Sequence, residues 1–148
     1  RPDMAFFKFT KAILEEKPID VFNYGKHTRD FTYIDDIVDG IIKAIDNTAI
    51  SNGDWDGNQP DPSSSMAPWC IYNIGNNKPV PLMDYINALE KALGKKAKIN
   101  FLPLQPGDVI DTYADVENLK EKFSYKPSTS VVNGVAKFIK WNQDYYKI

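Results

Sequence analysis

The chain has 148 residues, enough for one domain with a hydrophobic core, and it carries 18 basic against 20 acidic residues. This near balance excludes the general positive field typical of nucleic-acid binding proteins. No apolar run approaches the ~20 residues that a membrane span needs, so no membrane partner is expected. A single cysteine, Cys70, cannot form an internal disulfide, which fits a reducing compartment such as the cytoplasm. The chain begins Arg-Pro-Asp, without a signal-peptide pattern, as we expect of a fragment or a processed product.

The first 47 residues predict a helix, a strand and a second helix. A proline and an acid at positions 2 and 3 are typical of a helix start, and Pro18 ends that helix. Residues 19–25, IDVFNYG, alternate apolar and polar side chains, which predicts a short strand closed by Gly25. A helix from about residue 36 to residue 47 follows, with an aspartate as its N-cap and apolar residues along one face.

The remaining residues predict a long loop followed by further strands and helices. Residues 47–68 are rich in Gly, Pro, Ser and Asp and predict a flexible surface loop. Residues 70–75, CIYNIG, are apolar with little alternation, which is typical of a strand buried on both faces. A helix over residues 79–93 ends at Gly94, and a strand over residues 97–103, a short helix and a last helix after residues 126–130 complete the chain. Helices that alternate with short strands indicate an α/β or α+β fold.

The residue types alone describe a binding module without a reaction centre. None of the eight glycines falls into a G-x-G-x-x-G or P-loop pattern, so no phosphate cradle is visible. One cysteine and one histidine cannot form a Cys/His metal site. No G-x-S-x-G motif occurs, and no tyrosine has a lysine four positions after it. We interpret His27 as a solvated loop histidine, whose protonated form Lys26 and Arg29 would disfavour.

Several long stretches nevertheless resemble one enzyme family. They are RPDMAFFKFTKAI, IDVFNYGKHTRDFTYIDDIVDGI, APWCIYNIGNNKPVPLMDYINALEKALG and LPLQPGDVIDTYADVENL, together with the closing GVAKFIKWNQDYY. The whole chain is similar to the C-terminal half of NAD-dependent nucleotide-sugar epimerases of the extended short-chain dehydrogenase/reductase type. Within that type the resemblance is greatest to the UDP-glucuronate 4-epimerases. The R-D-[FY] motif alone indicates only the superfamily, whereas RPDMA, DVFNYGK and QPGDV together are more specific.

The resemblance implies an enzyme about twice this length. Its first half would be a Rossmann domain that binds NAD and supplies a Tyr-x-x-x-Lys pair, with the tyrosine as general base. UDP-glucuronate would be converted to UDP-galacturonate through a 4-keto sugar. Residues 1–148 would be the UDP-sugar binding region of this α/β fold, inactive alone, with no catalytic, NAD-binding or metal residues of their own. The helix after residue 35 and the CIYNIG strand would complete the Rossmann domain.

Arg29 is the main site residue that the resemblance implies. The arginine of the R-D-[FY] motif contacts the diphosphate of the UDP-sugar in the family. A guanidinium suits this role because it offers a planar fork of donors and keeps its charge near neutral pH. The alternative is a solvated arginine, or one paired with Asp30 or Asp35. Asp36 is interpreted as a structural residue at the helix start.

The resemblance also implies roles for five other residues. Val21 and Phe22 would line the uracil ring; the alternative is a plain core strand, and Val21 could have both roles. Gln105 stands where UDP-galactose epimerases have an arginine, so it could donate to the ligand without adding charge. Asp108 would accept a hydrogen bond from the ribose or from a neighbouring donor. Arg1 would lie near the sugar carboxylate or the phosphate.

Two other functions stay open on the sequence. The reaction could be that of another enzyme of the superfamily, such as a UDP-glucuronate decarboxylase, a dehydratase or a UDP-glucose 4-epimerase. The chain could also be a non-enzymatic nucleotide-binding module. The family's full-length enzymes are expected to be homodimers through helices of the first half. The isolated chain is therefore expected to self-associate through apolar surface that the first half would cover.

Overall fold

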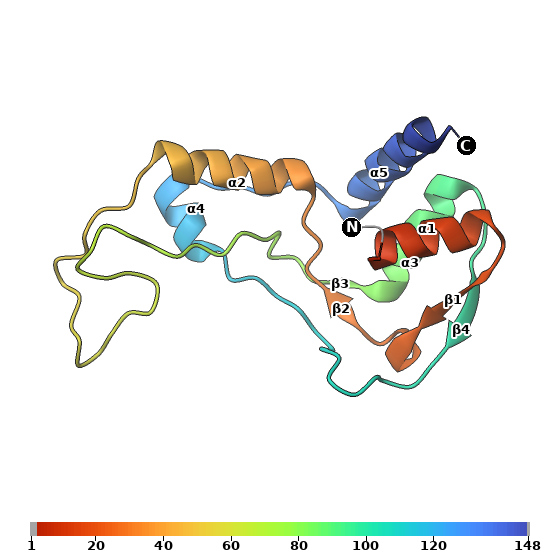
Figure 1. The fold of residues 1–148 in the computed structure, drawn as a ribbon, viewed down its shortest axis with the longest axis horizontal. Coiled ribbons are helices and arrows are strands. Elements are labelled where there is room, and N and C mark those ends of the chain that lie inside the picture. The colour runs from red at the N-terminus through yellow and green to blue at the C-terminus, as the bar shows by residue number, and fades with distance from the viewer. Residues whose placement is uncertain (1–2, 148) are drawn as a thin grey trace. The chain divides into compact units, whose positions relative to one another are not determined.

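A computed structural model of the chain describes residues 3–147 (Figure 1). Five α-helices, one 3₁₀ helix and four short strands occur in this part of the chain. In order they are α1 (Ala5–Leu14), β1 (Pro18–Val21), η1 (Phe22–Gly25), β2 (Thr28–Arg29), α2 (Ile34–Asp46), β3 (Val80–Pro81), α3 (Leu82–Leu93), β4 (Lys98–Phe101), α4 (Glu117–Phe123) and α5 (Val131–Tyr146). Every helix predicted from the sequence is present, and the predicted α/β class is confirmed.

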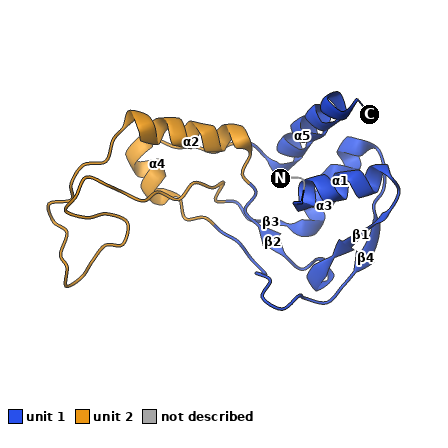
Figure 2. Ribbon diagram, in the orientation of Figure 1, with its two compact units in different colours: residues 1–31, 78–113, 129–148 blue, residues 32–77, 114–128 orange. Residues whose placement is uncertain are grey.

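The chain divides into two compact units, coloured separately in Figure 2. Unit 1 comprises residues 1–31, 78–113 and 129–148, and unit 2 comprises residues 32–77 and 114–128. The helix after residue 35 and the CIYNIG segment both belong to unit 2.

In unit 1, helix α1 packs on a parallel pair of strands, and α3 packs on both α1 and α5. Strand β1 pairs with β4 in parallel, from Pro18 opposite Lys98 to Val21 opposite Phe101. The buried core combines residues from each of these helices and from β1: Ile13, Ile19, Val21, Tyr85, Ile86, Ala88, Leu89, Val135 and Ile139. Helix α5 begins where the sequence predicts, because Ser130 caps it by accepting a hydrogen bond from the Asn133 N–H at 3.2 Å.

The strand predicted for residues 19–25 is shorter than expected. It ends at Val21, and residues 22–25 form the 3₁₀ helix η1. Asn23 and Tyr24 have positive φ angles of 49° and 51°, and Gly25 follows with a φ of 77°. A strand cannot continue through left-handed backbone, so the chain turns here. The Tyr24 N–H still donates to the Leu102 carbonyl, which keeps the turn beside the end of β4.

Two helix starts also differ from the prediction. Helix α1 begins at Ala5 after Met4 as N-cap, and Pro2 lies outside the described residues. Helix α2 begins at Ile34 after Tyr33, with no side-chain cap, so the predicted aspartate cap is wrong. Asp35 and Asp36 lie instead in the first turn, where carboxylates favour the positive end of the helix dipole. The carboxylate of Asp36 also accepts a hydrogen bond from the Ser128 N–H at 3.3 Å, which confirms its structural role.

In unit 2, the CIYNIG segment does not form the predicted strand buried on both faces. Cys70 makes an isolated bridge with Ser64, and residues 71–74 pair with no strand within the described part of the chain. Tyr72 and Ile74 pack on the small core of Val116, Leu119 and Tyr125. Ile71, between them in sequence, is 56% exposed. Only one face of the segment is covered, because Tyr72 and Ile74 pack on this core whereas Ile71 and Asn73 are exposed.

One face of α2 is exposed as well. Gly40 lies against Ile74 and Tyr125, so this side of the helix is packed within unit 2. Five apolar residues elsewhere on the helix are between 44% and 68% exposed: Ile34, Val38, Ile41, Ile42 and Ile45. We call them the α2 apolar face. A strip of this kind seldom stays in contact with water in a stable monomer.

The predicted loop is irregular, but its own hydrogen bonds hold it. The indole N–H of Trp55 donates to the Asp61 carbonyl at 3.2 Å. The carboxylate of Asp61 accepts hydrogen bonds from Ser63 and from the Ser64 hydroxyl, and these bonds, led by that from Ser64, lower the pKa of Asp61. None of the helices in residues 3–147 combines the length and the apolar character that crossing a bilayer needs.

Candidate functional site

The segment that carries Arg29 runs between two other segments of unit 1. On one side β2 pairs antiparallel with β3, and the His27 carbonyl accepts a hydrogen bond from the Leu82 N–H at 2.8 Å. On the other side the Thr28 N–H donates to Ile110, and the Thr112 N–H donates to Thr28, each at 3.2 Å. Backbone hydrogen bonds to segments on both edges therefore fix the main chain of residues 27–29, and with it the positions from which their side chains project. Neither β2 nor β3 was predicted from the sequence.

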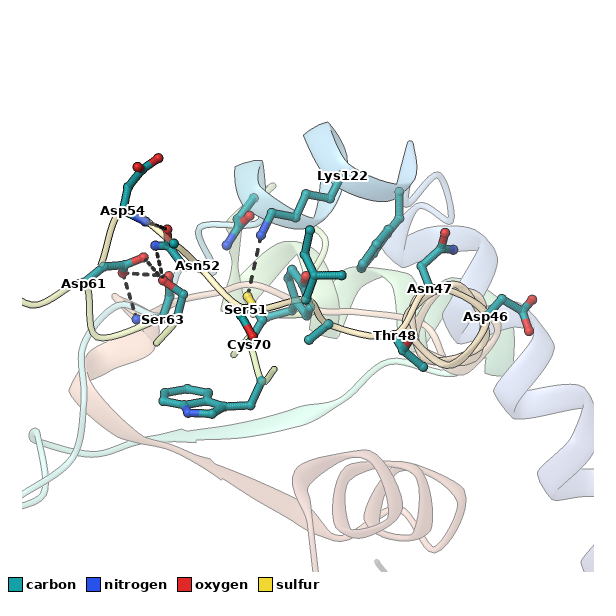
Figure 3. Close-up of a pocket in the computed structure, with 18 residues that line it drawn as sticks. Asp46, Asn47, Thr48, Ser51, Asn52, Asp54, Asp61, Ser63, Cys70 and Lys122 are labelled. Atoms are coloured by element: carbon teal, nitrogen blue, oxygen red, sulfur yellow. Dashed lines mark hydrogen bonds between the residues drawn. The ribbon is translucent and has the colours of Figure 1, made fainter. Parts of the chain in front are cut away.

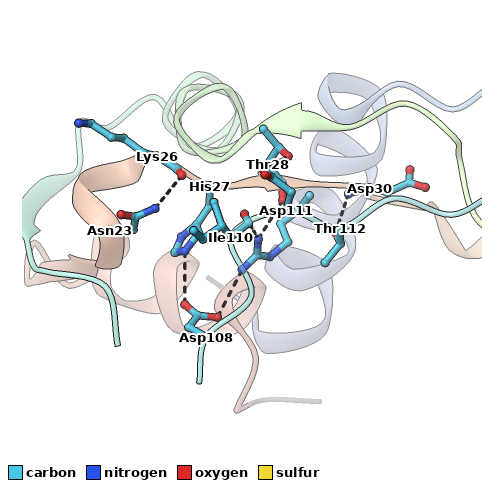
Figure 4. A network of polar contacts seen from close by, with 10 residues as sticks. Asn23, Lys26, His27, Thr28, Asp30, Asp108, Ile110, Asp111 and Thr112 are labelled. Atoms are coloured by element: carbon cyan, nitrogen blue, oxygen red, sulfur yellow. Dashed lines mark hydrogen bonds and ion pairs between the residues drawn. The ribbon is translucent and has the colours of Figure 1, made fainter. Parts of the chain in front are cut away.

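The main-chain carbonyls of Thr28 and Ile110, two residues labelled in Figure 4, hold the guanidinium of Arg29 in place. Its Nη1 donates to the Thr28 carbonyl at 2.9 Å and to the Ile110 carbonyl at 2.7 Å, which uses both hydrogens of that nitrogen. Its Nη2 lies 3.5 Å from Asp108 Oδ1, and the side chain is 25% exposed. Within the part of the chain that the structure describes, Nη2 and Nε form no hydrogen bond. Arg29 therefore keeps up to three N–H donors for an anionic ligand.

A tight turn brings Asp108 to Arg29. The Asp108 N–H donates to the Gln105 carbonyl at 3.1 Å, and Gly107 between them has a φ of 81°. Pro106 and Gly107 are the residues that the central positions of a type II turn favour, so the sequence QPGD specifies this turn. Asp108 Oδ1 lies 3.5 Å from Arg29 Nη2, and Oδ2 lies 3.5 Å from His27 Nε2. The carboxylate thus lies between the guanidinium of Arg29 and the imidazole of His27.

The interpretation of His27 as a solvated loop residue is wrong. Its side chain is only 4% exposed and its Nε2 faces Asp108. Lys26, by contrast, is exposed and its side chain points away from Asp108 in Figure 4. The sequence did contain a signal for this position of His27. In extended backbone, residues two apart project to the same side, so His27 lies on the side of Arg29 and Lys26 does not.

The other residues implied by the resemblance lie in different places. Val21 is 1% exposed and belongs to the core of unit 1, so the core alternative describes its side chain. Phe22 is half-buried at the start of η1, and Gln105 is exposed at the start of the turn that holds Asp108. Arg1 lies outside the described residues. The structure therefore brings Arg29 and Asp108 together and adds His27 to them.

Unit 2 has a separate cavity of about 870 Å³ beside its long loop (Figure 3). Lys122 Nζ lies there, 3.7 Å from Cys70 Sγ and 5.3 Å from the centre of the Tyr72 ring. Burial lowers the pKa of Lys122, but the neighbouring Cys70 and Tyr72 outweigh it and raise that pKa overall. Three carboxylates also line the cavity: Asp46, Asp54 and Asp61. This excess of acidic groups disfavours a diphosphate, which points to Arg29 in unit 1 as the anion site.

None of the strands in residues 3–147 passes through a glycine-rich turn into a helix. A dinucleotide site needs a strand that leads through a glycine-rich turn into the start of a helix. Within residues 3–147, β1 leads into η1 and β4 into the loop before Asp108, while β2 and β3 precede α2 and α3 without an intervening glycine. No group of three or more His, Cys, Asp or Glu side chains that could hold a metal occurs in the same range.

Comparison with known families identifies the chain. The model of the NAD dependent epimerase/dehydratase family matches residues 1–75, which is half of the sequence. The chain belongs to this family. The resemblance seen in the sequence is confirmed at this level.

Relatives with curated descriptions cover almost all of this epimerase/dehydratase chain. Protein CapI of Staphylococcus aureus is 52% identical over 99% of the chain. UDP-glucuronate 4-epimerase 2 of Arabidopsis thaliana is 42% identical over 99% of the chain. The chain spans only 44% and 34% of the lengths of these two relatives.

Solved structures of the family have the same fold. The chain aligns over 99% of its length with a variant of UDP-glucuronic acid 4-epimerase from Bacillus cereus, with a TM-score of 0.77 and 34% identity. The match covers 41% of that protein, which was crystallised with UDP-4-deoxy-4-fluoro-glucuronic acid and NAD. The α/β fold is therefore that of extended short-chain dehydrogenase/reductase epimerases and dehydratases, and the chain is equivalent to part of it.

Proposed function

We propose that residues 1–148 form the UDP-sugar binding part of an NAD-dependent nucleotide-sugar 4-epimerase that interconverts UDP-glucuronate and UDP-galacturonate. The observation that carries this proposal is the anchored guanidinium of Arg29, which keeps donors for an anion beside Asp108. The similarity to UDP-glucuronate 4-epimerases supports the identity of the nucleotide and of the sugar.

Each residue of the site has a distinct part in binding. Arg29 would donate from Nη2 and Nε to the diphosphate, since a guanidinium matches the spacing of phosphate oxygens. Asp108 would accept from a ribose hydroxyl, and Gln105 would donate to the ligand without adding charge. Phe22 would lie against the uracil, with the backbone of Val21 beside it.

The chemistry of the reaction would take place elsewhere in a longer protein. NAD, when bound there, supplies hydride transfer at the sugar; the residues of this chain bind and orient the sugar nucleotide. The α2 apolar face and Ile71 support this division, because they are exposed surfaces that a further domain would cover. The relatives, more than twice as long, are long enough to contain such a domain.

Two measurements test the proposal. The full-length protein, supplied with NAD and UDP-glucuronate, should produce UDP-galacturonate, identified by NMR of the sugar. Residues 1–148 alone should bind UDP and give no product. Loss of carbon dioxide from the sugar would indicate a decarboxylase instead, and UDP binding without any conversion by the full-length protein would indicate a non-enzymatic nucleotide-binding module.

A further inference from the structure

His27 has a buried nitrogen without a hydrogen bond. Its side chain is 4% exposed, and Nε2 has no hydrogen-bond partner in the part of the chain that the structure describes. The nearest acceptor is Asp108 Oδ2 at 3.5 Å, which is ion-pair distance but longer than a good hydrogen bond. A buried polar atom without a partner destabilises a protein, so such an atom in a binding site calls for a functional reason.

The contact between Asp108 and Arg29 is also longer than a good hydrogen bond. Its Oδ1 lies 3.5 Å from Arg29 Nη2, whereas charge-assisted hydrogen bonds are typically about 2.7–2.9 Å long. Arg29 is anchored through Nη1 alone, so Nη2 can exchange one acceptor for another without movement of the backbone. The Asp108 carboxylate therefore forms no hydrogen bond with His27 or Arg29, although an atom of each side chain lies 3.5 Å from it.

We propose that His27 is a positioning residue that takes over Asp108 when a diphosphate engages Arg29, an inference that rests on the proposed function. A diphosphate that accepts from Nη2 would compete with Asp108 for the guanidinium. The carboxylate would then lose its cationic neighbour and lie beside an anion. His27, with its hydrogen on Nε2, closes the 3.5 Å gap and donates to Oδ2. This bond holds the carboxylate away from the phosphates and keeps it directed at the ribose.

Other charged groups of this region do not substitute for His27. Lys26, next in sequence, points away from Asp108. Asp111 accepts a hydrogen bond from the Thr28 hydroxyl at 2.6 Å and adds no donor. The replacement of Arg29 by another donor to Asp108 therefore depends on the imidazole of His27.

Titration calorimetry with UDP on the full chain tests this. His27→Met fills a similar volume without a donor and should weaken UDP binding about three- to tenfold, the size expected for one net hydrogen bond. His27→Gln places an amide donor at similar reach and should bind UDP within about twofold of wild type. In an Asp108→Asn background, where the carboxylate charge is absent, His27→Met should change UDP binding by less than about twofold. Equal melting temperatures of the Met and Gln variants would show that their difference in UDP affinity comes from the lost donor and not from altered packing.

NMR of the wild-type chain gives a second test that needs no variant to fold. Residues 1–148 contain one histidine, so the imidazole signals are those of His27. Saturation with UDP should shift the Nε2–H proton downfield and slow its exchange with water. The role of His27 would be overturned by an unchanged NMR signal, or by a His27→Gln variant that binds UDP as weakly as His27→Met. In that case Arg29→Ala would still lose affinity for UDP, and the proposed function would stand. If Arg29→Ala bound UDP like wild type, the proposed function would fail as well.

Discussion

Arg29 Nη1 donates a hydrogen bond to the carbonyl of Ile110 at 2.7 Å, across 81 positions of the sequence. Together with the bond to the carbonyl of Thr28, this contact stops the guanidinium from rotating. One edge of the guanidinium is thus fixed by the backbone, and the other edge keeps N–H donors that form no hydrogen bond within the described residues. Less side-chain freedom is then lost on binding, which favours affinity.

Replacement of Arg29 by alanine should therefore weaken UDP binding about 10- to 100-fold, because hydrogen bonds to charged groups contribute about 1.5–3 kcal/mol. Arg29→Lys should recover only part of the affinity, since lysine keeps the charge and loses the fork. Lys26→Ala is the matched control: it removes a cation three positions away that points elsewhere, and it should bind nearly as wild type. Calorimetric titration with UDP measures all three variants, and comparable losses in Arg29→Ala and Lys26→Ala would show that only general charge matters.

Gly25→Ala should destabilise the protein by roughly 1–3 kcal/mol. Gly25 has a φ of 77°, and a Cβ there would lie 2.8 Å from the sulfur of Met83. Gly53→Ala is the control, because a Cβ at that position would meet nothing within 4 Å. Urea unfolding followed by circular dichroism compares the two variants; equal midpoints would show that position 25 does not require glycine.

Glu90→Gln should reduce stability at neutral pH by about 0.5–1.5 kcal/mol, a modest value because its partner Lys96 is exposed. Glu90 accepts hydrogen bonds from the Lys96 ammonium and from the Ala97 N–H, the latter at 2.9 Å. The bond from Lys96 lowers the pKa of Glu90 below its ordinary value of 4.5, although burial opposes the shift. Glu121→Gln, on an exposed side chain, is the control and should leave stability unchanged.

The same group gives a pH dependence of known sign. Because the pKa of Glu90 is lower in the folded state, its contribution is complete above about pH 4.5 and is lost as the pH falls through the lowered value. Wild type should therefore lose its stability advantage over Glu90→Gln below that pH. Thermal melts from pH 7 to pH 3 measure the difference between the two proteins, and a difference that grows on acidification would refute the assignment.

Residues 1–148 alone should self-associate through the α2 apolar face. Ile41 and Ile45 are 44% and 68% exposed, and glutamates in both positions should shift the chain towards monomer by making that face polar. Val132→Glu, at an exposed valine of α5, is the control and should leave the oligomeric state unchanged. Light scattering after size-exclusion chromatography distinguishes these outcomes, and a wild-type chain that is monomeric at all concentrations would contradict the prediction.

The local elements were readable from the sequence because their signals are local. Gly94 after an apolar periodic run predicted the end of α3, and the segment 126–130 before another predicted the start of α5; both were confirmed. The turn at Pro106 and Gly107 follows from backbone preferences of those two residues alone. The strand predicted for CIYNIG is absent because its formation does not depend on local signals alone. Its composition predicts a strand, but a strand exists only beside another, and that partner is not determined by the segment itself.

The candidate site divides in the same way. The sequence by itself determined that Arg29 and Asp108 are residues of the types that bind a diphosphate and a ribose, and the motifs around them indicated the family. Only the tertiary structure decided that these residues meet, that the carbonyl of Ile110 anchors the guanidinium, and that His27 is buried against the carboxylate. The physical reason is that Asp108 and Ile110 are about 80 positions from Arg29 in sequence, so the contacts depend on how the β2 segment pairs with residues 110–112. No local preference encodes that pairing.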